Sequence, residues 1–380
     1  MKSKNKIILV SNIGSASRKY FVYSVSDKNK IEEMFSIQFD QKEFYPSVKL
    51  EDAMIEFFEI AKNKHSLNIE DIDFVAERVV AVGEFFLENK IIDAEYLEEL
   101  NKSKQYDILH TESLIHELKQ LFSIKENSKI KKNKCNFKII GISDSTFHSS
   151  IEEEVYTYAI KDFKSDRNFR RYGYHGISMS GIANELGSKY KKIIAIHLGG
   201  GGSVTAIENG KSVFNSFGMT PASGLINLTR VGDIDPFIAF HVYKKYKKNF
   251  NLLDIGDTAF ESAKEEIYEK SGLFALTGER DMRDILDNLK VKNKSQREKS
   301  EFALKVYINK INESVGTAYA HLGNVDALVL TGSILEKSEI FRKMFLPKIS
   351  WLNLEKKNIH ILKTEEEKEI ARLVIEGKFV

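Results

Sequence analysis

The chain has 380 residues, of which 42% are hydrophobic and 29% are charged, a composition typical of globular rather than disordered proteins. Lysine plus arginine (57) nearly balance aspartate plus glutamate (55), and a net charge of +2 excludes the bulk basic field that holds nucleic acid or an anionic membrane. The single cysteine, Cys135, excludes an intrachain disulfide framework and a cysteine-based zinc site. The apolar run at residues 7–10 is too short for a signal peptide, and no run approaches the ~18–20 residues that span a membrane. We expect a soluble, cytoplasmic protein of about two domains.

The first part of the chain mixes strand and helix patterns. Strands are predicted at residues 7–10 and 20–25, on either side of a polar turn at residues 11–17 (SNIGSAS). Apolar side chains at helical spacing predict a helix at residues 51–62, and residues 74–82 form a β-rich run. Further predictions are helices at 94–100 and 113–122, a solvated loop at 125–134 and a buried strand at 137–142.

After residue 150 strands and helices alternate, which favours an α/β domain. A strand at residues 192–197 leads through a glycine run at 198–203 into a returning strand at 204–207. Further predictions are helices at 236–246, 298–322 and 366–376 and strands at 327–330 and 359–362. Because no Ser/Gly-rich linker separates the two parts, we expect a packed hinge close to residue 147.

Residues 7–17 and 193–203 share one plan, namely an apolar strand, a Gly/Ser turn and a second strand. Turns of this kind expose successive backbone N–H groups, which can bind an anion. Either turn alone is most simply an ordinary β-hairpin. Their repetition favours a duplicated fold that holds a phosphate chain between its halves.

Arginine and histidine gather beside glycines at residues 170–176 (RRYGYHG) and 229–236 (TRVGDIDP). Phosphoryl transfer spreads charge over three equatorial oxygens, so its catalysis depends mostly on cations and positioning. Asp144, after a predicted buried strand, and Glu366, near the C-terminus, are acidic candidates for Mg²⁺, which takes only one or two protein carboxylates. These patterns point to magnesium-dependent phosphoryl transfer.

The same residues also have structural interpretations. Arg230 could pair with a nearby aspartate, and His175 and His197 could be hydrogen-bonded core histidines. Asp144 could cap a turn, and Glu366 could begin a solvated helix.

The motifs, taken together, resemble the acetate kinase family, in the acyl-kinase branch of the sugar kinase, Hsp70 and actin superfamily. The match is collinear from Val10 to Ala371, nearly the whole chain. The segments that carry it are residues 11–19 (SNIGSASRK), 77–80 (ERVV), 109–110 (LH), 144–148 (DSTFH), 171–176 (RYGYHG), 197–199 (HLG), 229–236 (TRVGDIDP), 281–285 (DMRDI) and 364–367 (TEEE). One such motif is weak evidence, whereas nine in order are strong.

The resemblance implies an α/β fold with two ribonuclease-H-like lobes, as in actin-type ATPases, and an active-site cleft between them. The expected bounds are 1–147 plus 367–380 for one lobe and 148–366 for the other. The implied reaction is reversible in-line phosphoryl transfer between ATP and acetate, giving acetyl phosphate and ADP, with Mg²⁺ or alternatively Mn²⁺. A homodimer is also implied, without nucleic acid or membrane partners.

The resemblance also implies roles for individual residues. Arg78 and Arg230 would clamp the acyl phosphate and the transferring group, while His175 would stabilise the developing charge. Asp144 and Glu366 would organise the metal, with Asn12 as a further ligand. The acyl pocket would be formed by Arg78, Val80, Leu109, Tyr174 and Pro221. The nucleotide and phosphate residues would be Asn12, Ser15, Ser17, Lys19, His197, Gly199, Gly200, Gly201, Asp281, Met282, Arg283, Gly332, Ser333 and Ile334.

The chain departs from the family pattern mainly on the nucleotide side. Gly200 stands where the second phosphate loop usually has asparagine. Residues 331–337 (TGSILEK) replace the usual T-A-G-I-G-E-N. We therefore expect Ser333 and Leu335 to crowd the adenosine pocket, with strain wherever a non-glycine residue must take a positive φ. Ala81, Val82 and Met179 are further departures.

These departures leave three functions open. The first is an acetate kinase that uses ATP. The second is an acyl kinase with pyrophosphate as donor, or with propionate or another short acid as substrate. The third is a catalytically weak relative retained for binding or regulation.

Overall fold

The computed structural model describes residues 5–14, 17–40, 44–45, 47–106, 111–130, 135–160, 169–247, 258–377 and 379. The chain divides into two compact units. The first comprises Met1–Ser149, Gly176–Gly181 and Glu365–Val380, and the second comprises Ser150–His175 and Ile182–Thr364. This grouping places Glu366 in the first unit.

A six-stranded sheet forms the centre of the first unit, in the order β3-β2-β1-β4-β6-β5. Strand β1 (Lys6–Ile13) pairs antiparallel with β2 (Ser17–Val25) and parallel with β4 (Phe74–Val79). The other strands are β3 (Ile31–Asp40), β5 (Lys90–Ile91) and β6 (Lys138–Ser143). Because β1 extends to Ile13, the turn after it is shorter than predicted.

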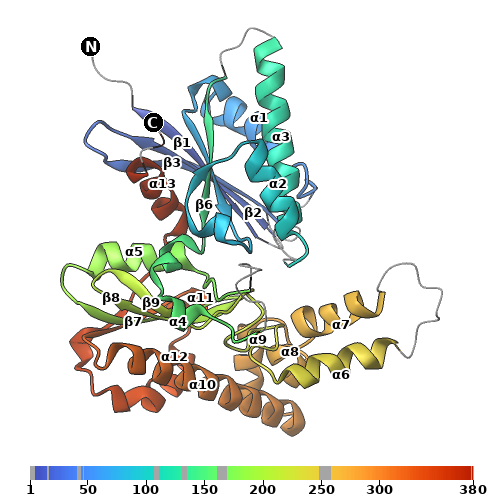
Figure 1. Cartoon of the computed structure of the whole chain (residues 1–380), viewed down its shortest axis with the longest axis vertical. Helices are drawn as coiled ribbons and strands as arrows, with labels where there is room; N and C mark the ends of the chain where they lie inside the picture. The colour runs from blue at the N-terminus through green and yellow to red at the C-terminus, as the bar shows by residue number, and fades with distance from the viewer. Residues whose placement is uncertain are drawn as a thin grey trace. The chain divides into compact units, whose positions relative to one another are not determined.

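Both faces of this sheet are covered. Leu9 lies in a core formed with helices α1 (Ala53–His65), α2 (Ala94–Ser103) and α3 (Thr111–Ile130), whereas its neighbour Ile8 lies in a second core with α13 (Glu366–Glu376) (Figure 1). A strand that is buried on both faces has a continuous apolar sequence, which is why β1 could be predicted from residues 7–10.

The predicted loop at residues 125–134 is wrong over 125–130, because α3 continues to Ile130. Lys125 anchors this last part of the helix. Its ammonium donates to the carbonyl of Phe137 at 2.8 Å and lies 5.6 Å from the centroid of that ring. A lysine-rich segment can therefore remain helical when one of its side chains is anchored. Residues 131–134, the rest of the predicted loop, lie outside the described part of the chain.

The second unit is built on a five-stranded sheet in the order β11-β10-β7-β8-β9. Strand β7 (Lys192–Leu198) pairs antiparallel with β8 (Gly202–Glu208) and parallel with β10 (Ala327–Thr331). The outer strands are β9 (Lys211–Asn215) and β11 (Ile359–Ile361). The helices are α4 (Glu153–Tyr156), α5 (Gly176–Leu186, which begins in the first unit), α6 (Pro236–Lys247), α7 (Thr258–Glu269), α8 (Gly272–Thr277), α9 (Met282–Asp287), α10 (Lys294–Leu322), α11 (Ser333–Lys337) and α12 (Glu339–Phe345).

The two sheets follow the same plan. In each unit the first three strands form an antiparallel series, β1-β2-β3 in the first unit and β7-β8-β9 in the second. On its other side the first strand pairs parallel with the next main strand, β4 or β10, which in turn pairs parallel with β6 or β11. Among the described residues, only the first sheet carries an added edge strand, β5. The predicted duplication of the fold is confirmed.

Each unit contains one residue type that occurs once in the chain. Cys135 is buried in the core of the first unit. In the second unit the Trp351 indole donates to Asn312 Oδ1 at 2.9 Å and packs edge-on against Tyr319. Across the described residues, no helix has both the length and the apolar character needed to cross a membrane.

Candidate active site

In the first unit the ends of three neighbouring parallel strands bring polar side chains together. Arg78 in β4 places Nη2 2.7 Å from Asp144 Oδ2, just beyond β6, and donates through Nη1 to Asn12 Oδ1 in β1 at 3.2 Å. Its Nη1 also lies 3.3 Å from Glu366 Oε2 at the start of α13. The carboxyl ends of parallel strands are where α/β sheets usually bind ligands.

The charges in this cluster support one another. Burial alone would lower the pKa of Arg78, but Asp144 and Glu366 outweigh burial and raise that pKa, so the guanidinium stays charged. Glu366 also accepts a hydrogen bond from Ser178 Oγ at 2.7 Å. The side-chain amide of Asn12 donates to Glu367 Oε1 at 2.9 Å. Each predicted residue of this cluster is thus held in a defined orientation.

Asp144 retains one carboxylate oxygen, Oδ1, that is buried and has no hydrogen-bond partner among the described residues. A buried, unsatisfied anionic oxygen is costly, and a cation would satisfy it. The described residues include no group of three or more His, Cys, Asp or Glu side chains able to hold a metal ion. The partnerless oxygen of Asp144 nevertheless suits Mg²⁺, which takes few protein carboxylates and completes its shell with water and phosphate oxygens.

The second unit brings together the two predicted histidines. The rings of His175 and His197 are stacked, with centroids 4.2 Å apart, and His175 Nδ1 lies 3.0 Å from Ser203 Oγ. The ring of Phe217 meets His175 edge-on. His175 has a φ of 61°, a left-handed conformation that is uncommon outside glycine and is often found at functional sites.

The glycine loop after β7 approaches His175 and Arg230. A Cβ atom on Gly201 would lie 3.5 Å from His175 Nε2 and 3.7 Å from Arg230 Nη1. Arg230 Nη1 also donates to the carbonyl of Pro221 at 3.1 Å. Asp233, one of the aspartates that could have paired with Arg230, accepts instead from the N–H of Gly224 at 2.8 Å. The structure thus gathers the loop, His175 and Arg230 in one place.

Comparison with known proteins identifies this arrangement. The model of the acetokinase family matches residues 7–372. The acetate kinase of Mycoplasma genitalium is 30% identical over 367 residues, covering 92% of this chain and 86% of that protein. The acetate kinase of Wigglesworthia glossinidia brevipalpis is 32% identical over 375 residues, with coverages of 92% and 88%. The chain belongs to the acetokinase family.

Solved structures agree with this membership of the acetokinase family. An acetate kinase from Entamoeba histolytica matches with a TM-score of 0.74 at 25% identity, covering 98% of this chain and 99% of that chain. A propionate kinase from Francisella tularensis matches with a TM-score of 0.76 at 25% identity, with coverages of 97% and 98%. The chain therefore has the α/β, actin-type fold of this family and is a phosphotransferase with a carboxyl group as acceptor.

The loop that departs from the acetokinase pattern is ordered by its own residues. The positive φ, 83°, falls on Gly332, where a Cβ would lie 2.4 Å from the carbonyl oxygen of Leu198. Glu336 Oε1 accepts from the backbone N–H of both Gly332 and Thr364 at 2.9 Å. Helix α11 begins immediately afterwards, at Ser333.

The expectation that Leu335 crowds the adenosine pocket is wrong. Leu335 is fully buried in the core of the second unit, because the helical turn of α11 directs it there. The expected strain is absent as well, since the positive φ belongs to Gly332. Ser333 remains at the loop, with its Oγ 3.6 Å from the position that a Cβ on Gly199 would occupy.

Other predicted nucleotide residues have structural contacts. Asp281 caps α9, and its Oδ2 lies 2.6 Å from Nη2 of Arg283, whose side chain is 86% exposed. Met282 and Ile334 are buried in the core of the second unit. Any nucleotide contact by these two would therefore use backbone atoms.

The remaining predicted residues are divided between the units. Val80 is buried just beyond β4 in the first unit, while Ser17 and Lys19 lie in β2. In the second unit Tyr174 is buried and donates its hydroxyl proton to the carbonyl of Met219 at 2.7 Å. Ser15 and Leu109 lie outside the described residues.

Three supporting residues were not predicted from the sequence. Ser178 donates a hydrogen bond to Glu366, Ser203 lies within hydrogen-bond distance of His175, and Glu336 accepts from the backbone N–H of Gly332. Each lies within a few residues of a recognised motif, and that proximity was their only sequence signal.

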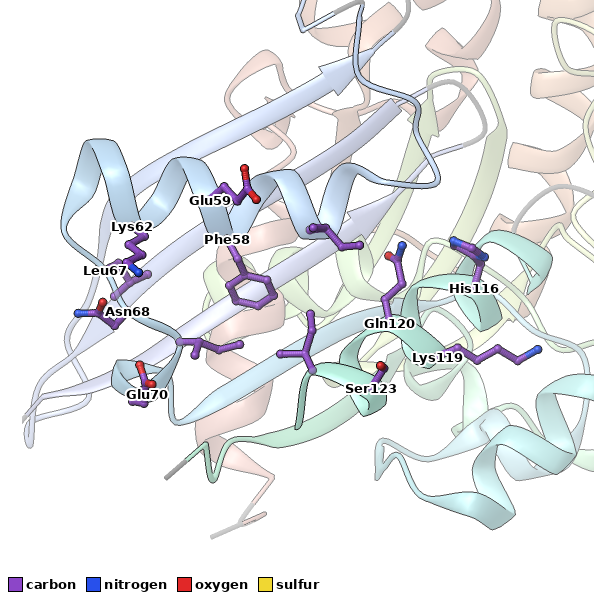
Figure 2. A pocket seen from close by; sticks show the side chains of 13 residues that line it. Phe58, Glu59, Lys62, Leu67, Asn68, Glu70, His116, Lys119, Gln120 and Ser123 are labelled. Carbon is purple, nitrogen blue, oxygen red and sulfur yellow. The ribbon is translucent and has the colours of Figure 1, made fainter. Parts of the chain in front are cut away.

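A separate cavity of about 760 Å³ lies in the first unit between α1 and α3 (Figure 2). Phe58 forms part of its apolar lining, and Glu59, Lys62 and Lys119 are among its charged residues. None of the residues predicted to act in catalysis or binding lines it. It is therefore not a candidate for the acetokinase active site.

Proposed function

We propose that this chain is an acetate kinase that transfers a phosphoryl group reversibly between ATP and acetate, with acetyl phosphate and ADP on the other side. The observation that carries the proposal is the cluster of Arg78 with Asp144, Glu366 and Asn12 at the ends of parallel strands. A charged guanidinium beside a carboxylate oxygen that lacks a partner suits a substrate made of phosphate and metal. We also propose a cytoplasmic location, which is the one that membership of the family implies.

Mg²⁺, or Mn²⁺ in its place, would neutralise charge on the phosphate oxygens when bound. Asp144, Glu366 and Asn12 are the residues that would hold it. Arg78 fixes their relative positions, because one guanidinium bonds to all three side chains. It would also bind the acyl phosphate, with Val80 close to the acyl group.

In the second unit, His175 and Arg230 would stabilise charge as it develops on the transferring group. The contact of His175 Nδ1 with Ser203 leaves Nε2 on the side of Gly201. Preoriented donors of this kind are effective because they need no reorganisation during the reaction. The phosphate chain would lie along the glycines from 199 to 201.

The test is acyl-phosphate formation trapped with hydroxylamine. The donors are ATP, GTP and pyrophosphate, the acids run from formate to butyrate, and each reaction is repeated with excess chelator. We expect the highest kcat/KM with ATP and acetate, and no product with chelator. A preference for pyrophosphate or propionate would select the corresponding alternative, and no product with any pair would overturn the assignment as an enzyme.

We also propose that the protein is a homodimer, as the family implies. Helix α6 supports this because none of its residues is buried, and it exposes Phe237 (78%), Ile238 (50%) and Phe240 (66%). An aromatic face of this kind usually marks a protein interface. Sedimentation should show a dimer, and Phe237→Asp with Phe240→Asp should give a folded monomer. An unchanged sedimentation coefficient in the double variant would contradict the location of this interface.

A further inference from the structure

Two glutamates are buried behind the loop between β1 and β2. Glu77, in β4 opposite Ser11 of β1, is fully buried, and Glu117 of α3 is 3% exposed. Glu117 accepts hydrogen bonds from Ser11 Oγ at 2.5 Å and from the Tyr20 hydroxyl at 2.8 Å. Neither carboxyl oxygen of Glu77 has a hydrogen-bond partner among the described residues. The proposed reaction uses neither carboxyl directly, so their burial needs an explanation.

The surroundings of the two carboxyls assign the charge to Glu117. Burial, and then the neighbouring Glu117, raise the pKa of Glu77 well above its ordinary value, although Ser11 and Arg18 act on it in the opposite direction. Burial also raises the pKa of Glu117, but the hydroxyls of Ser11 and Tyr20 and the charge of Arg18 favour its ionised form. Two buried carboxyls that interact this closely do not both ionise. Glu117 accepts a hydrogen bond at each carboxyl oxygen and Glu77 at neither, so the geometry favours Glu117 as the carboxylate and Glu77 as the group that keeps its proton.

Arg18 connects this charge to the loop. The side chain is 6% exposed, and its Nη1 donates to the carbonyls of Gly14 and Ser17 on the two sides of the loop. The N–H of Gly14 also donates to the Ser17 carbonyl at 2.9 Å. A buried guanidinium needs a nearby anion, because an uncompensated buried charge is strongly destabilising. Arg18 and Glu117 line the same small cavity, and the charge of Arg18 lowers the pKa of Glu117, so Glu117 supplies a counter-charge close to the guanidinium.

Ser11 connects Glu117 to the catalytic cluster. It directly precedes Asn12, whose side chain accepts from Arg78 and donates to Glu367. Ser11 itself is fully buried and makes no contact with solvent. A shift of Ser11 would therefore move Asn12 without removing any group that meets the substrate.

We propose that Glu117 is a positioning residue whose buried carboxylate fixes the first phosphate loop, through the hydrogen bond to Ser11 and the charge of Arg18. This inference rests on the proposed function, because it assumes that the loop binds a phosphate chain. Glutamine at position 117 could satisfy the two hydroxyls, which rotate freely, but it would leave Arg18 without its counter-charge. The loop would then lose its shape while the fold remained.

The central test compares Glu117→Gln with Glu77→Gln, two changes of the same chemistry within one buried cluster. Misplaced supporting residues typically cost ~10- to 100-fold in activity, and we expect this loss of kcat/KM for the phosphoryl donor in Glu117→Gln. The KM for acetate should stay within about twofold, because the acyl side is untouched. Glu77→Gln should stay within about twofold of wild type throughout, because that carboxyl is already neutral.

A second pair tests the route through Ser11. Ser11→Ala and Tyr20→Phe each remove one hydrogen bond to Glu117, but only Ser11 belongs to the loop strand. Ser11→Ala should lower kcat/KM for the donor, whereas Tyr20→Phe should change only the melting temperature. Because Ser11 and Glu117 act as a unit, the kcat/KM of their double variant should be no lower than that of the less active single variant.

Calorimetry of ADP binding in the presence of Mg²⁺ separates this inference from the proposed function. We expect weaker ADP binding by Glu117→Gln and wild-type binding by Glu77→Gln. Equal affinities in both variants and in wild type would overturn the positioning role even if the wild type makes acetyl phosphate. Failure of the wild type to make acyl phosphate would instead overturn the proposed function. Should Glu117→Gln not fold, the Ser11→Ala and Tyr20→Phe pair decides, and equal donor kcat/KM in that pair overturns the inference.

Discussion

The β1–β2 and β7–β8 hairpins occupy equivalent places in two sheets of the same strand order, yet their loops are held by different forces. The first loop is closed by the buried guanidinium of Arg18, with the carboxylate of Glu117 behind it. In the second, the N–H of Gly199 donates to the Gly201 carbonyl at 2.8 Å, and a Cβ on Gly202 would lie 3.0 Å from the Leu198 side chain.

The difference shows that a duplicated backbone plan does not duplicate the interactions that maintain it. The first loop depends on charge, so it should tolerate changes of size better than changes of ionisation. The second is packed closely at its ends, where Gly202 and Gly332 approach Leu198, so side-chain atoms added there should harm it more than altered charge. Substitutions that change charge and substitutions that add bulk therefore separate these two kinds of dependence.

The largest effect is expected from Arg78→Ala compared with Arg230→Ala. Both remove a cation aimed at the transferring group, which is worth roughly 10³–10⁵ in rate. Arg78 is bonded to the carboxylates of Asp144 and Glu366 in the first unit, and breaking such a buried pair costs about 3–5 kcal/mol. We therefore expect both variants to lose activity, but Arg78→Ala to show the larger fall in melting temperature. Equal melting temperatures, or more than about a tenth of wild-type activity in either variant, would contradict these roles.

A smaller effect, on stability, is expected from Gly332→Ala. The new Cβ would lie 2.4 Å from the Leu198 carbonyl oxygen at a φ of 83°, and a non-glycine residue at such an angle costs about 1–3 kcal/mol before any clash. Gly200→Ala is the matched control, because a Cβ there meets nothing within 4 Å. Thermal unfolding should show a lower melting temperature for the first variant only. Equal values for the two would show that stability does not depend on the close approach of Gly332 to Leu198.

The smallest effect concerns Glu77→Gln and pH. An unfolded glutamate titrates near pH ~4.3, whereas burial and the neighbouring Glu117 raise the pKa of Glu77 in the folded chain. Above this pH the folded chain binds more protons than the unfolded chain, so the free energy of unfolding falls as pH rises. Glutamine avoids this loss. The melting temperature of Glu77→Gln relative to that of wild type should therefore rise from about pH 5 to about pH 8. A difference between the two proteins that does not change with pH would show that Glu77 is ionised in the folded chain.

Strands buried on both faces were the part of the fold most readily predicted from sequence. The run at β1 is continuous and apolar because helices cover both sides of its sheet. Strand β3 (Ile31–Asp40) was missed because it is an edge strand whose exposed positions, such as Glu32 and Glu33, break the apolar pattern. Helix α5 was missed because its small residues give no clear helical periodicity.

Motifs predicted which residues gather, but not what supports them. Arg78, Asp144 and Glu366 were expected at one site, and Arg78 is bonded to both carboxylates. The pairing of Glu117 with Ser11 joins positions 106 residues apart, and no local pattern reports a contact at that separation. For Leu335 the prediction itself was wrong. The residue was expected to face the ligand because it lies in a loop motif, whereas the helical turn directs its side chain into the core.

The placement of the sole cysteine and the sole tryptophan gives each unit its own intrinsic reporter. Cys135 is 1% exposed in the first unit, so a thiol reagent can modify it only when that core opens. The fluorescence of Trp351, by contrast, arises in the second unit alone. Labelling kinetics and emission, followed during one denaturation, therefore measure how independently the two halves of a duplicated protein come apart, without introducing a foreign probe.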